Sequence, residues 1–419
     1  MTGPTMITHG CRLNAVESEA MRRMAVSAGL EEAVIVNTCA VTNEAVRSSR
    51  QSVRKARREH PDAKIIVTGC AAQTEPEMFA ALSEADAVIG NAEKLAPDEW
   101  RRMANDDHDR IRVNDIMSVR DTAAHLIDAY GDRARAFLEV QNGCDHRCTF
   151  CIIPYGRGNS RSKPIDSVIE QARLLVDGGH KEIVLTGVDL TSYGADLDTP
   201  ARLGDLVGAI LDNTPGLYRL RLSSIDGAEI DDALMERICG DHRLAPHLHL
   251  SLQAGNNLIL KRMKRRHTRE QAIDLCTSIR ARRPEVAFGA DIIAGFPTET
   301  DAMFEDSLNI IDDAGLSFVH VFSFSPREGT PAARMPQLPR QLIKERAAAL
   351  RKKADTAHRA LLDSLHGSEA EAIVESGGRA RLGNFALMQL DASEAPAGAA
   401  VRVLIGARDG DMIRGSIIS

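Results

Sequence analysis

The sequence has few aromatic residues and no long apolar segment. Phe, Trp and Tyr make up 4% of its 419 residues, with a single Trp. No stretch approaches the ~20 apolar residues that span a bilayer, and the first residues, MTGPTMITHGC, contain neither a basic leader nor an apolar signal core. We therefore expect no membrane segment and a cytoplasmic location.

An excess of positive charge is also absent. The chain has 52 Lys and Arg against 59 Asp and Glu, a net charge of -7. Any contact with RNA must therefore come from local basic patches. The 43% content of hydrophobic residues excludes a disordered chain. At ~100 to 200 residues per domain, the length predicts two or three domains.

Short β-branched runs alternate with helix-like stretches through the first part of the chain. These runs lie at residues 5–9, 33–38, 64–69 and 86–90. This alternation is typical of βαβ units and a parallel sheet. We expect a first α/β domain over residues 1–92 and a polar connecting segment over residues 93–133.

Six further strand candidates follow, each separated from the next by room for one helix. They lie at residues 136–141, 182–187, 218–224, 247–252, 288–295 and 318–324. Right-handed crossovers predict an open (β/α)6 barrel over residues 134–364, with its site at the carboxyl ends of the strands. Short strands punctuated by Gly predict a small C-terminal β-barrel over residues 365–419.

Three cysteines lie in the loop NGCDHRCTFCIIPYG, which directly follows the first strand of the predicted barrel. They are Cys144, Cys148 and Cys151. Iron–sulfur clusters usually have four Cys ligands, so three thiolates leave one iron open to another ligand. The alternative is a zinc site with His146 as the fourth ligand. Zinc ribbons normally have two CxxC pairs, and the absence of a second pair favours the cluster.

Cys11, Cys39 and Cys70 each follow one of the first three predicted strands. The carboxyl ends of parallel strands line one edge of a sheet, so these thiols can converge although they lie about 30 residues apart. Their convergence predicts a second cluster. The alternatives are ordinary buried cysteines, or one thiol acting as a nucleophile. Cys239 and Cys276 lie within helix-like stretches, and we assign both to packing.

Segments along nearly the whole chain resemble the radical S-adenosylmethionine (SAM) methylthiotransferases. They are GCRLNAVESE, VNTCAVTNEA, VTGCAAQ, GCDHRCTFCIIPYGRG, LTGVDLTSYG, LSLQAG, DIIAGFPTET and SFSPREGTPAARMPQ. The resemblance implies an N-terminal methylthiotransferase domain, a radical SAM barrel and a C-terminal TRAM domain. Members of the family insert a methylthio group into a C–H bond of tRNA or of a ribosomal protein.

The resemblance also implies the cofactors. Cys144, Cys148 and Cys151 would hold a [4Fe-4S] cluster that binds SAM and cleaves it to a 5′-deoxyadenosyl radical. The other cysteine trio, Cys11, Cys39 and Cys70, would hold an auxiliary [4Fe-4S] cluster that carries the transferred sulfur. An adenine C–H bond is too inert for acid–base attack, which explains the need for a radical. We also expect an electron donor such as flavodoxin or ferredoxin.

Several residues match positions that contact SAM in this family. They are Phe150, Gly187, Asp189, Ser223, Gln253, Gly295 and Glu299. Glycine allows close approach of the backbone to a ligand, and barrel sites collect polar side chains at carboxyl strand ends. The alternative for each is a turn or cap residue. His247 and His249 alternate with Leu along a strand, and we interpret them as structural.

The substrate is expected to be tRNA. GCRLN around Cys11 and VTNEA after Cys39 resemble most the branch that acts on N6-threonylcarbamoyladenosine beside the anticodon. The alternatives are the branch acting on N6-isopentenyladenosine, with GCQMN, and the branch acting on an aspartate of a ribosomal protein, with GCPKN. An alternative from another class is a non-catalytic iron–sulfur protein that binds RNA.

Two basic clusters are candidates for contact with tRNA phosphates. They comprise Arg47, Arg50, Arg54, Lys55, Arg57 and Arg58 in the first domain, and Lys261, Arg262, Lys264, Arg265 and Arg266 in the barrel. The alternative for each is a solvated helix face. Residues 366–419 contain seven acidic residues against five arginines, which leaves the RNA-binding role of the C-terminal barrel open.

Overall fold

The computed structural model describes residues 3–107, 109–120, 134–391 and 395–418. The chain forms two compact units. The first contains the described residues up to 120, together with Gln141–Ser162 and Ser325–Ala333, and the second contains the rest. The loop with the CxxxCxxC sequence therefore belongs to the first unit, although we expected it within the barrel domain. Part of the expected connecting segment, residues 121–133, lies outside the described residues.

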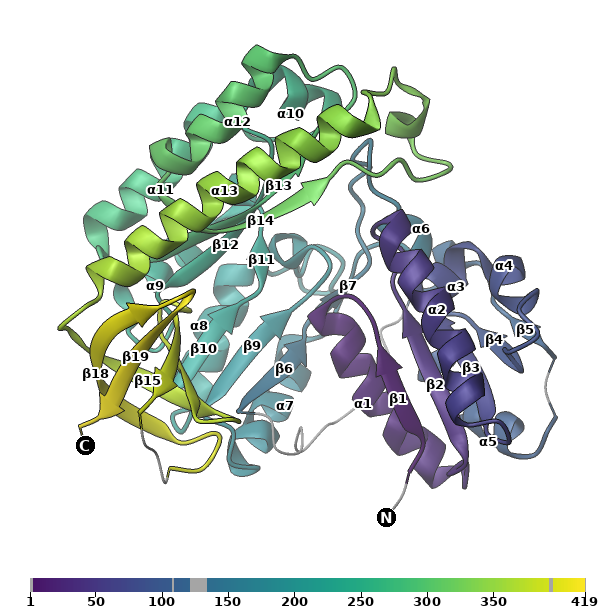
Figure 1. Cartoon of the computed structure of the whole chain (residues 1–419). Helices are drawn as coiled ribbons and strands as arrows, with labels where there is room; N and C mark the ends of the chain where they lie inside the picture. The colour runs from purple at the N-terminus through teal and green to yellow at the C-terminus, as the bar shows by residue number, and fades with distance from the viewer. Residues whose placement is uncertain (1–2, 108, 121–133, 392–394, 419) are drawn as a thin grey trace. The chain divides into compact units, whose positions relative to one another are not determined.

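The first unit contains a five-stranded parallel sheet. Its strands follow chain order, β1 (Thr5–Thr8), β2 (Ala33–Thr38), β3 (Lys64–Gly69), β4 (Ala87–Ile89) and β5 (Ile111–Arg112) (Figure 1). The first four match the predicted runs. The fifth strand comes from the expected connecting segment, so the first sheet continues beyond residue 92.

Helices cover both faces of this sheet. They are α1 (Arg12–Ser27), α2 (Asn43–Glu59), α3 (Cys70–Thr74), α4 (Pro76–Ala80) and α5 (Pro97–Ala104), with 3-10 turns η1 (Glu93–Leu95) and η2 (Ile116–Ser118). Successive strand residues point to opposite faces, so each face has its own core. Val34 packs in a cluster with Val53 of α2, whereas Ile35 packs in a cluster with Met21 of α1 and Trp100 of α5.

A short hairpin completes the first unit. Its antiparallel strands are β7 (Gln141–Asn142) and β8 (Arg161–Ser162), and α6 (Ile153–Arg157) lies in the loop between them. This loop contains the CxxxCxxC sequence.

The second unit contains the predicted open (β/α)6 barrel. Its parallel strands form two sheets, β6 (Arg135–Glu139), β9 (Glu182–Thr186) and β10 (Arg219–Leu222), then β11 (Ser224–Ile225), β12 (His247–Gln253), β13 (Ala287–Ala294) and β14 (Leu316–Ser323). Only Ser223 separates β10 from β11. Chain order is kept across both sheets, as right-handed crossovers require.

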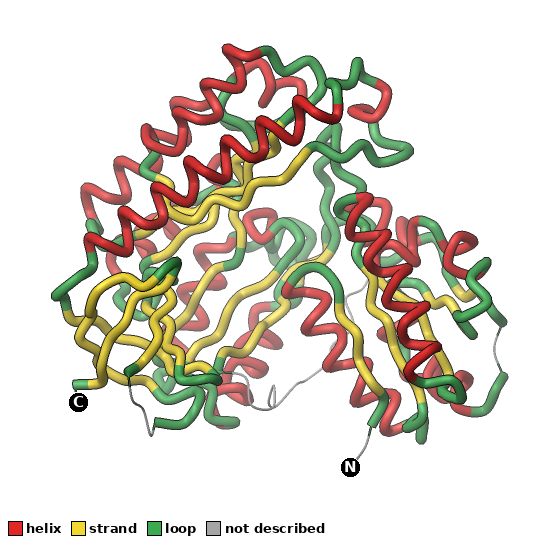
Figure 2. The backbone as a smooth tube through the Cα atoms, in the orientation of Figure 1, coloured by secondary structure: helices red, strands yellow, loops and turns green. Residues whose placement is uncertain are grey.

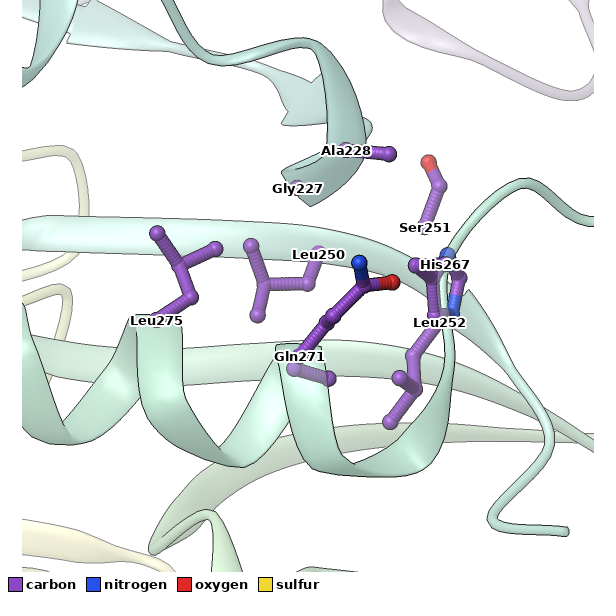
Figure 3. A pocket seen from close by; sticks show the side chains of 9 residues that line it. Gly227, Ala228, Leu250, Ser251, Leu252, His267, Gln271 and Leu275 are labelled. Atoms are coloured by element: carbon purple, nitrogen blue, oxygen red, sulfur yellow. The ribbon is translucent and has the colours of Figure 1, made fainter. Parts of the chain in front are cut away.

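Helices lie on one side of these strands (Figure 2). They are α7 (Ile165–Asp177), α8 (Leu203–Asn213), α9 (Asp232–Gly240), α10 (Asn257–Met263), α11 (Arg269–Arg282), α12 (Asp301–Asp313) and α13 (Arg340–Ser364), with 3-10 turns η3 (Leu190–Ser192), η4 (Gly227–Glu229) and η5 (Pro331–Arg334). Leu250 and Leu252 of β12, together with Leu275 of α11, line a small apolar cavity (Figure 3). Over the described ranges, we find no helix with the length and apolar character to cross a membrane.

A closed five-stranded barrel ends the second unit. Its strands are β15 (Glu369–Glu375), β16 (Arg379–Leu382), β17 (Leu387–Leu390), β18 (Ala400–Asp409) and β19 (Met412–Ile417). The loop between β16 and β17 contacts the larger barrel. Phe385 stacks on His247 with ring centroids 4.7 Å apart, and Arg221 donates to the Gly383 carbonyl over 3.0 Å. These contacts fasten the C-terminal module to the barrel.

Candidate metal centres

Cys11, Cys39 and Cys70 follow strands β1, β2 and β3, as predicted. Cys11 precedes α1 as its N-cap residue, Cys39 directly follows Thr38 at the end of β2, and Cys70 begins α3. Gly10 has φ +89°, and a Cβ atom there would lie 2.9 Å from the Sγ of Cys39. The loops after β1 and β2 therefore approach each other closely.

The loop after β3 meets the same strand ends. Gly69 has φ +97°, and a Cβ atom there would lie 2.4 Å from the backbone nitrogen of Thr38, next to Cys39. Only glycine fits this close backbone approach without strain. The turn at Gly69 therefore positions Cys70 beside the end of β2.

The electrostatics of Cys39 agree with this convergence. Burial, assisted by charge on Cys70 and Cys11, raises the pKa of the Cys39 thiol to about 11. Cys39 and Cys70 are buried, and Cys11 is exposed. Three clustered thiols, two of them buried, can ionise together only if a cation compensates their charge. The donor set therefore fits an iron–sulfur cluster, which is bound by thiolates.

Cys144, Cys148 and Cys151 lie in the loop between β7 and β8. Gly143 has φ +73°, and a Cβ atom there would lie 1.8 Å from the carbonyl oxygen of Asn159. The Cys144 amide donates to the Gly158 carbonyl over 3.1 Å, and the Cys151 amide donates to the Cys148 carbonyl over 3.1 Å. The loop is thus closed at its base, and its last two cysteines share one turn.

Helix α6, which follows the CxxxCxxC loop, contacts Cys70 within the first unit. A Cβ atom at Gly156 of α6 would lie 3.3 Å from the Cβ of Cys70. Asn91 bridges the same place, because its Nδ2 lies 3.7 Å from the Cys70 Sγ and also donates to the Gly156 carbonyl. Gly156 follows Cys151 by five residues. The segment that follows the CxxxCxxC loop therefore contacts Cys70 in this unit.

Sequence reasoning missed a buried ionic network beside Cys70. Arg157 and Lys94 both pair with Glu17. Burial acts to raise the pKa of Glu17, but Arg157 and Lys94 together lower it to about 2. Burial lowers the pKa of Lys94, and Glu17 opposes that shift. Two of these residues lie inside motifs that resemble the family. Glu17 is in GCRLNAVESE, and Arg157 is in GCDHRCTFCIIPYGRG.

The predicted SAM contacts are divided between the units. Phe150 lies in the first unit, half-buried in the turn before Cys151. In the second unit, Gly187 follows β9 and Asp189 precedes η3, where it accepts a 2.9 Å hydrogen bond from the Ser192 hydroxyl. Asp189 therefore also fits the alternative prediction of a turn or cap residue.

Three other predicted contacts of the second unit, Ser223, Gln253 and Gly295, also lie at strand ends. Ser223 is buried between β10 and β11, and its hydroxyl oxygen has no hydrogen-bond partner in the described part of the chain. Gln253 ends β12 with φ +75°. Gly295 follows β13, also with φ +75°, and its amide donates to Glu299 over 3.0 Å. Glu299 also pairs with Arg346 of α13 over 2.8 Å.

The histidines of β12 have structural partners. His247 stacks on Phe385, and the Nε2 of His249 lies 2.9 Å from the Oδ1 of Asp291 on β13. His320 of β14 contacts the same oxygen over 3.2 Å.

The two basic clusters differ in how many of their side chains remain exposed. On α2, Arg47 and Lys55 have side chains that are 68% and 62% exposed, whereas Arg57 pairs with Asp86 and donates to two carbonyl groups. Arg54 and Arg58 are also exposed, and Arg50 is half-buried.

In the barrel cluster, Lys261 and Lys264 are exposed and Arg262 is half-buried. Arg265 and Arg266 instead bind Asp226 over 2.8 and 2.9 Å. The Arg265 side chain is only 8% exposed and that of Arg266 is 36% exposed, so the cation cluster on α2 is the more accessible one.

Comparisons with known proteins first indicate the class of protein to which the chain belongs. The family model described as "Radical SAM superfamily" matches residues 138–311, and the one described as "Uncharacterized protein family UPF0004" matches residues 5–90. A solved structure of the radical SAM methyltransferase TsrM from Kitasatospora setae has a TM-score of 0.57 and 14% identity, covering 76% of this chain and 69% of that chain. This likeness shows a shared fold. The match of residues 138–311 to the family model indicates the radical SAM class.

Two curated relatives narrow the class to a family. Threonylcarbamoyladenosine tRNA methylthiotransferase MtaB of Rickettsia prowazekii is 50% identical over 386 residues, which cover 92% of this chain and 91% of the relative. tRNA-2-methylthio-N(6)-dimethylallyladenosine synthase of Erythrobacter litoralis is 33% identical over 388 residues, 88% of this chain and 86% of that relative. The chain belongs to the radical SAM methylthiotransferases of the MtaB type. Membership implies a [4Fe-4S] cluster and SAM as cofactors.

Proposed function

We propose that the chain methylthiolates N6-threonylcarbamoyladenosine beside the anticodon of tRNA, using two [4Fe-4S] clusters. The observation that carries this proposal is that both cysteine trios lie in the first unit, where α6, just after the CxxxCxxC loop, packs against Cys70. The choice of nucleoside is supported by 50% identity to the threonylcarbamoyladenosine enzyme, compared with 33% to the dimethylallyladenosine enzyme.

Each trio has a distinct task in this proposal. Cys144, Cys148 and Cys151 would hold one cluster and leave one iron open for SAM. The dispersed trio, Cys11, Cys39 and Cys70, would hold the auxiliary cluster. When bound, the clusters supply the electron that cleaves SAM and the sulfur that is transferred. The protein holds the thiolates at fixed positions through the turns at Gly10, Gly69 and Gly143, and it keeps Cys39 and Cys70 away from bulk water.

The second unit supplies SAM contacts in this proposal. Ser223 is the strongest candidate, because its buried hydroxyl has no partner among the described residues and lies where β10 passes into β11. The half-buried strand-end residues Gly187, Asp189 and Gln253 remain candidates. Glu299 is a weaker candidate, since it already binds Gly295 and Arg346.

The partners follow from the reaction. We propose that tRNA binds through the exposed cations of α2, which neutralise its phosphates. Reductive cleavage of SAM needs one electron, so we propose a donor such as flavodoxin or ferredoxin. A tRNA substrate favours a cytoplasmic location.

Nucleoside analysis of a deletion strain tests the function. Mass spectrometry of digested tRNA should show loss of 2-methylthio-N6-threonylcarbamoyladenosine and accumulation of the nucleoside that lacks the methylthio group. The wild-type gene should restore the product, and a Cys148→Ala gene should not.

Other outcomes separate the alternatives. Unchanged tRNA with loss of a methylthio-aspartate in ribosomal peptides would assign the protein substrate instead. Loss of only the 2-methylthio derivative of N6-isopentenyladenosine would assign the other tRNA branch. A purified, reduced protein that cleaves no SAM would be a non-catalytic RNA-binding protein.

A further inference from the structure

The network beside Cys70 buries two cations with one anion. Side chains of Glu17 on α1, Lys94 on η1 and Arg157 on α6 are 1%, 0% and 2% exposed. The two guanidinium nitrogens of Arg157 contact the two carboxylate oxygens of Glu17 over 2.7 and 2.9 Å. The Nζ of Lys94 contacts Glu17 Oε2 over 2.8 Å.

The other partners of this network carry no charge. Arg157 donates to the side-chain oxygens of Asn14 and Asn142, and Lys94 donates to that of Asn91 over 2.6 Å. Among the hydrogen bonds of the described residues, these groups have no second carboxylate partner. One buried positive charge is therefore left over, which is costly unless an anion lies nearby.

The excess charge lies next to the auxiliary trio. Asn91, which binds Lys94, also contacts the Cys70 Sγ, and Gly156 next to Arg157 packs against Cys70. On the other side, Asn14 binds Arg157 and donates over 3.1 Å to the carbonyl of Thr38, the residue before Cys39. Three thiolates outweigh the positive charge of an oxidised cubane core, so a cluster held here would be anionic.

We propose that Glu17, Lys94 and Arg157 are positioning residues that supply the charge balance of the auxiliary cluster and thereby raise its reduction potential. The inference rests on the proposed second cluster. Reduction adds negative charge to the cluster, and a fixed positive charge in a dry surrounding stabilises the reduced form. The network also joins α1, η1 and α6, so it couples the auxiliary site to the loop of the second trio.

A purely structural role is the competing explanation. If the network only held the helices together, removing either partner of an ion pair would weaken it. Every substitution would then shift the midpoint potential in the same direction. Charge balance makes the opposite prediction, because removing the carboxylate leaves more positive charge and removing a cation leaves less. The sign of the shift therefore separates the two explanations.

The test is a redox titration of the reconstituted holoenzyme, followed by electron paramagnetic resonance. The auxiliary signal is the one that persists when Cys144, Cys148 and Cys151 are replaced by Ala. Arg157→Gln and Lys94→Gln should shift its midpoint potential downward, and Glu17→Gln should shift it upward. Arg157→Lys keeps the charge and should leave the potential closer to that of the wild type.

A more exposed ion pair on the same helix provides a matched control. Glu19 and Arg22 of α1 pair over 2.7 Å with side chains 20% and 44% exposed. Glu19→Gln and Arg22→Gln should not move the potential, since solvent screens their charges.

Two results would overturn the inference. The first is a shift of the midpoint potential in the same direction for Glu17→Gln and Arg157→Gln, and the second is no shift in either variant. If Arg157→Gln does not fold, Lys94→Gln takes its place in this comparison. A wild-type protein with only one cluster would instead refute the proposed function.

Discussion

The two cysteine trios are built in different ways. Cys144, Cys148 and Cys151 come from one short loop, which the β7–β8 hairpin closes at its base. Cys11, Cys39 and Cys70 come from three loops that only the parallel sheet brings together. A compact trio can be recognised by spacing alone, whereas a dispersed trio exists only when the sheet is formed. One site therefore depends on local sequence, and the other depends on the topology of the sheet.

Replacing the compact trio by Ala should have the largest effect. The Cys144→Ala, Cys148→Ala, Cys151→Ala variant loses the cluster that cleaves SAM, so formation of 5′-deoxyadenosine should be abolished and about half of the iron lost. Chromatography of the reaction products and iron analysis measure both quantities. Continued formation of 5′-deoxyadenosine would show that this loop does not hold the SAM cluster.

Replacing the dispersed trio should separate the two tasks. In the Cys11→Ala, Cys39→Ala, Cys70→Ala variant, about half of the iron should again be lost, but 5′-deoxyadenosine should still form because the other cluster remains. Methylthiolation of tRNA should be absent. An equal loss of 5′-deoxyadenosine in both triple variants would contradict the assignment of separate tasks to the two trios.

Glycine substitutions probe how each trio is held. Gly69→Ala and Gly143→Ala place a Cβ atom 2.4 and 1.8 Å from backbone atoms at positive φ, so each should lower the free energy of unfolding by more than ~1 kcal/mol. Each should also weaken retention of the adjacent cluster. The control is Gly29→Ala, where φ is +79° but nothing lies within 4 Å, so only the backbone strain remains. Thermal unfolding and iron content measure the effects, and an equal loss at Gly29 would contradict the role of close packing.

Thiol reactivity of the cluster-free protein should show a smaller contrast. Cys39 is 7% exposed and burial raises its pKa to about 11, whereas the cysteines of the compact trio are half-exposed. Because the thiolate is the reactive form, iodoacetamide should label Cys39 roughly tenfold more slowly than Cys144 or Cys148. Mass spectrometry of the labelled peptides gives the rates, and equal rates would mean that the dispersed trio opens when it holds no cluster.

The sequence predicted the parts that depend on local patterns. The β-branched and apolar runs predicted the strands of the parallel sheets in both units, and the ends of these strands predicted the positions of Cys11, Cys39 and Cys70. The open barrel was predicted from the spacing of its strands, and the small C-terminal barrel from short strands punctuated by Gly.

Long-range pairing could not be predicted in this manner. Strand β5 is only two residues long and lies in a polar segment, so its run was too short to recognise. The sequence places Arg265 and Arg266 in a basic cluster. Their partner Asp226 lies about 40 residues earlier, so only the fold shows the pairing. Likewise, Glu17 and Arg157 are separated by 140 positions, and only the fold shows that they meet.

Iron and sulfide analysis of the anaerobically reconstituted wild-type protein tests the central claim most directly. Two cubane clusters predict about eight iron and about eight sulfide atoms per chain. Mössbauer spectroscopy should assign this iron to [4Fe-4S] clusters. A protein that binds zinc without sulfide, or one that saturates at about four iron atoms, would contradict the account.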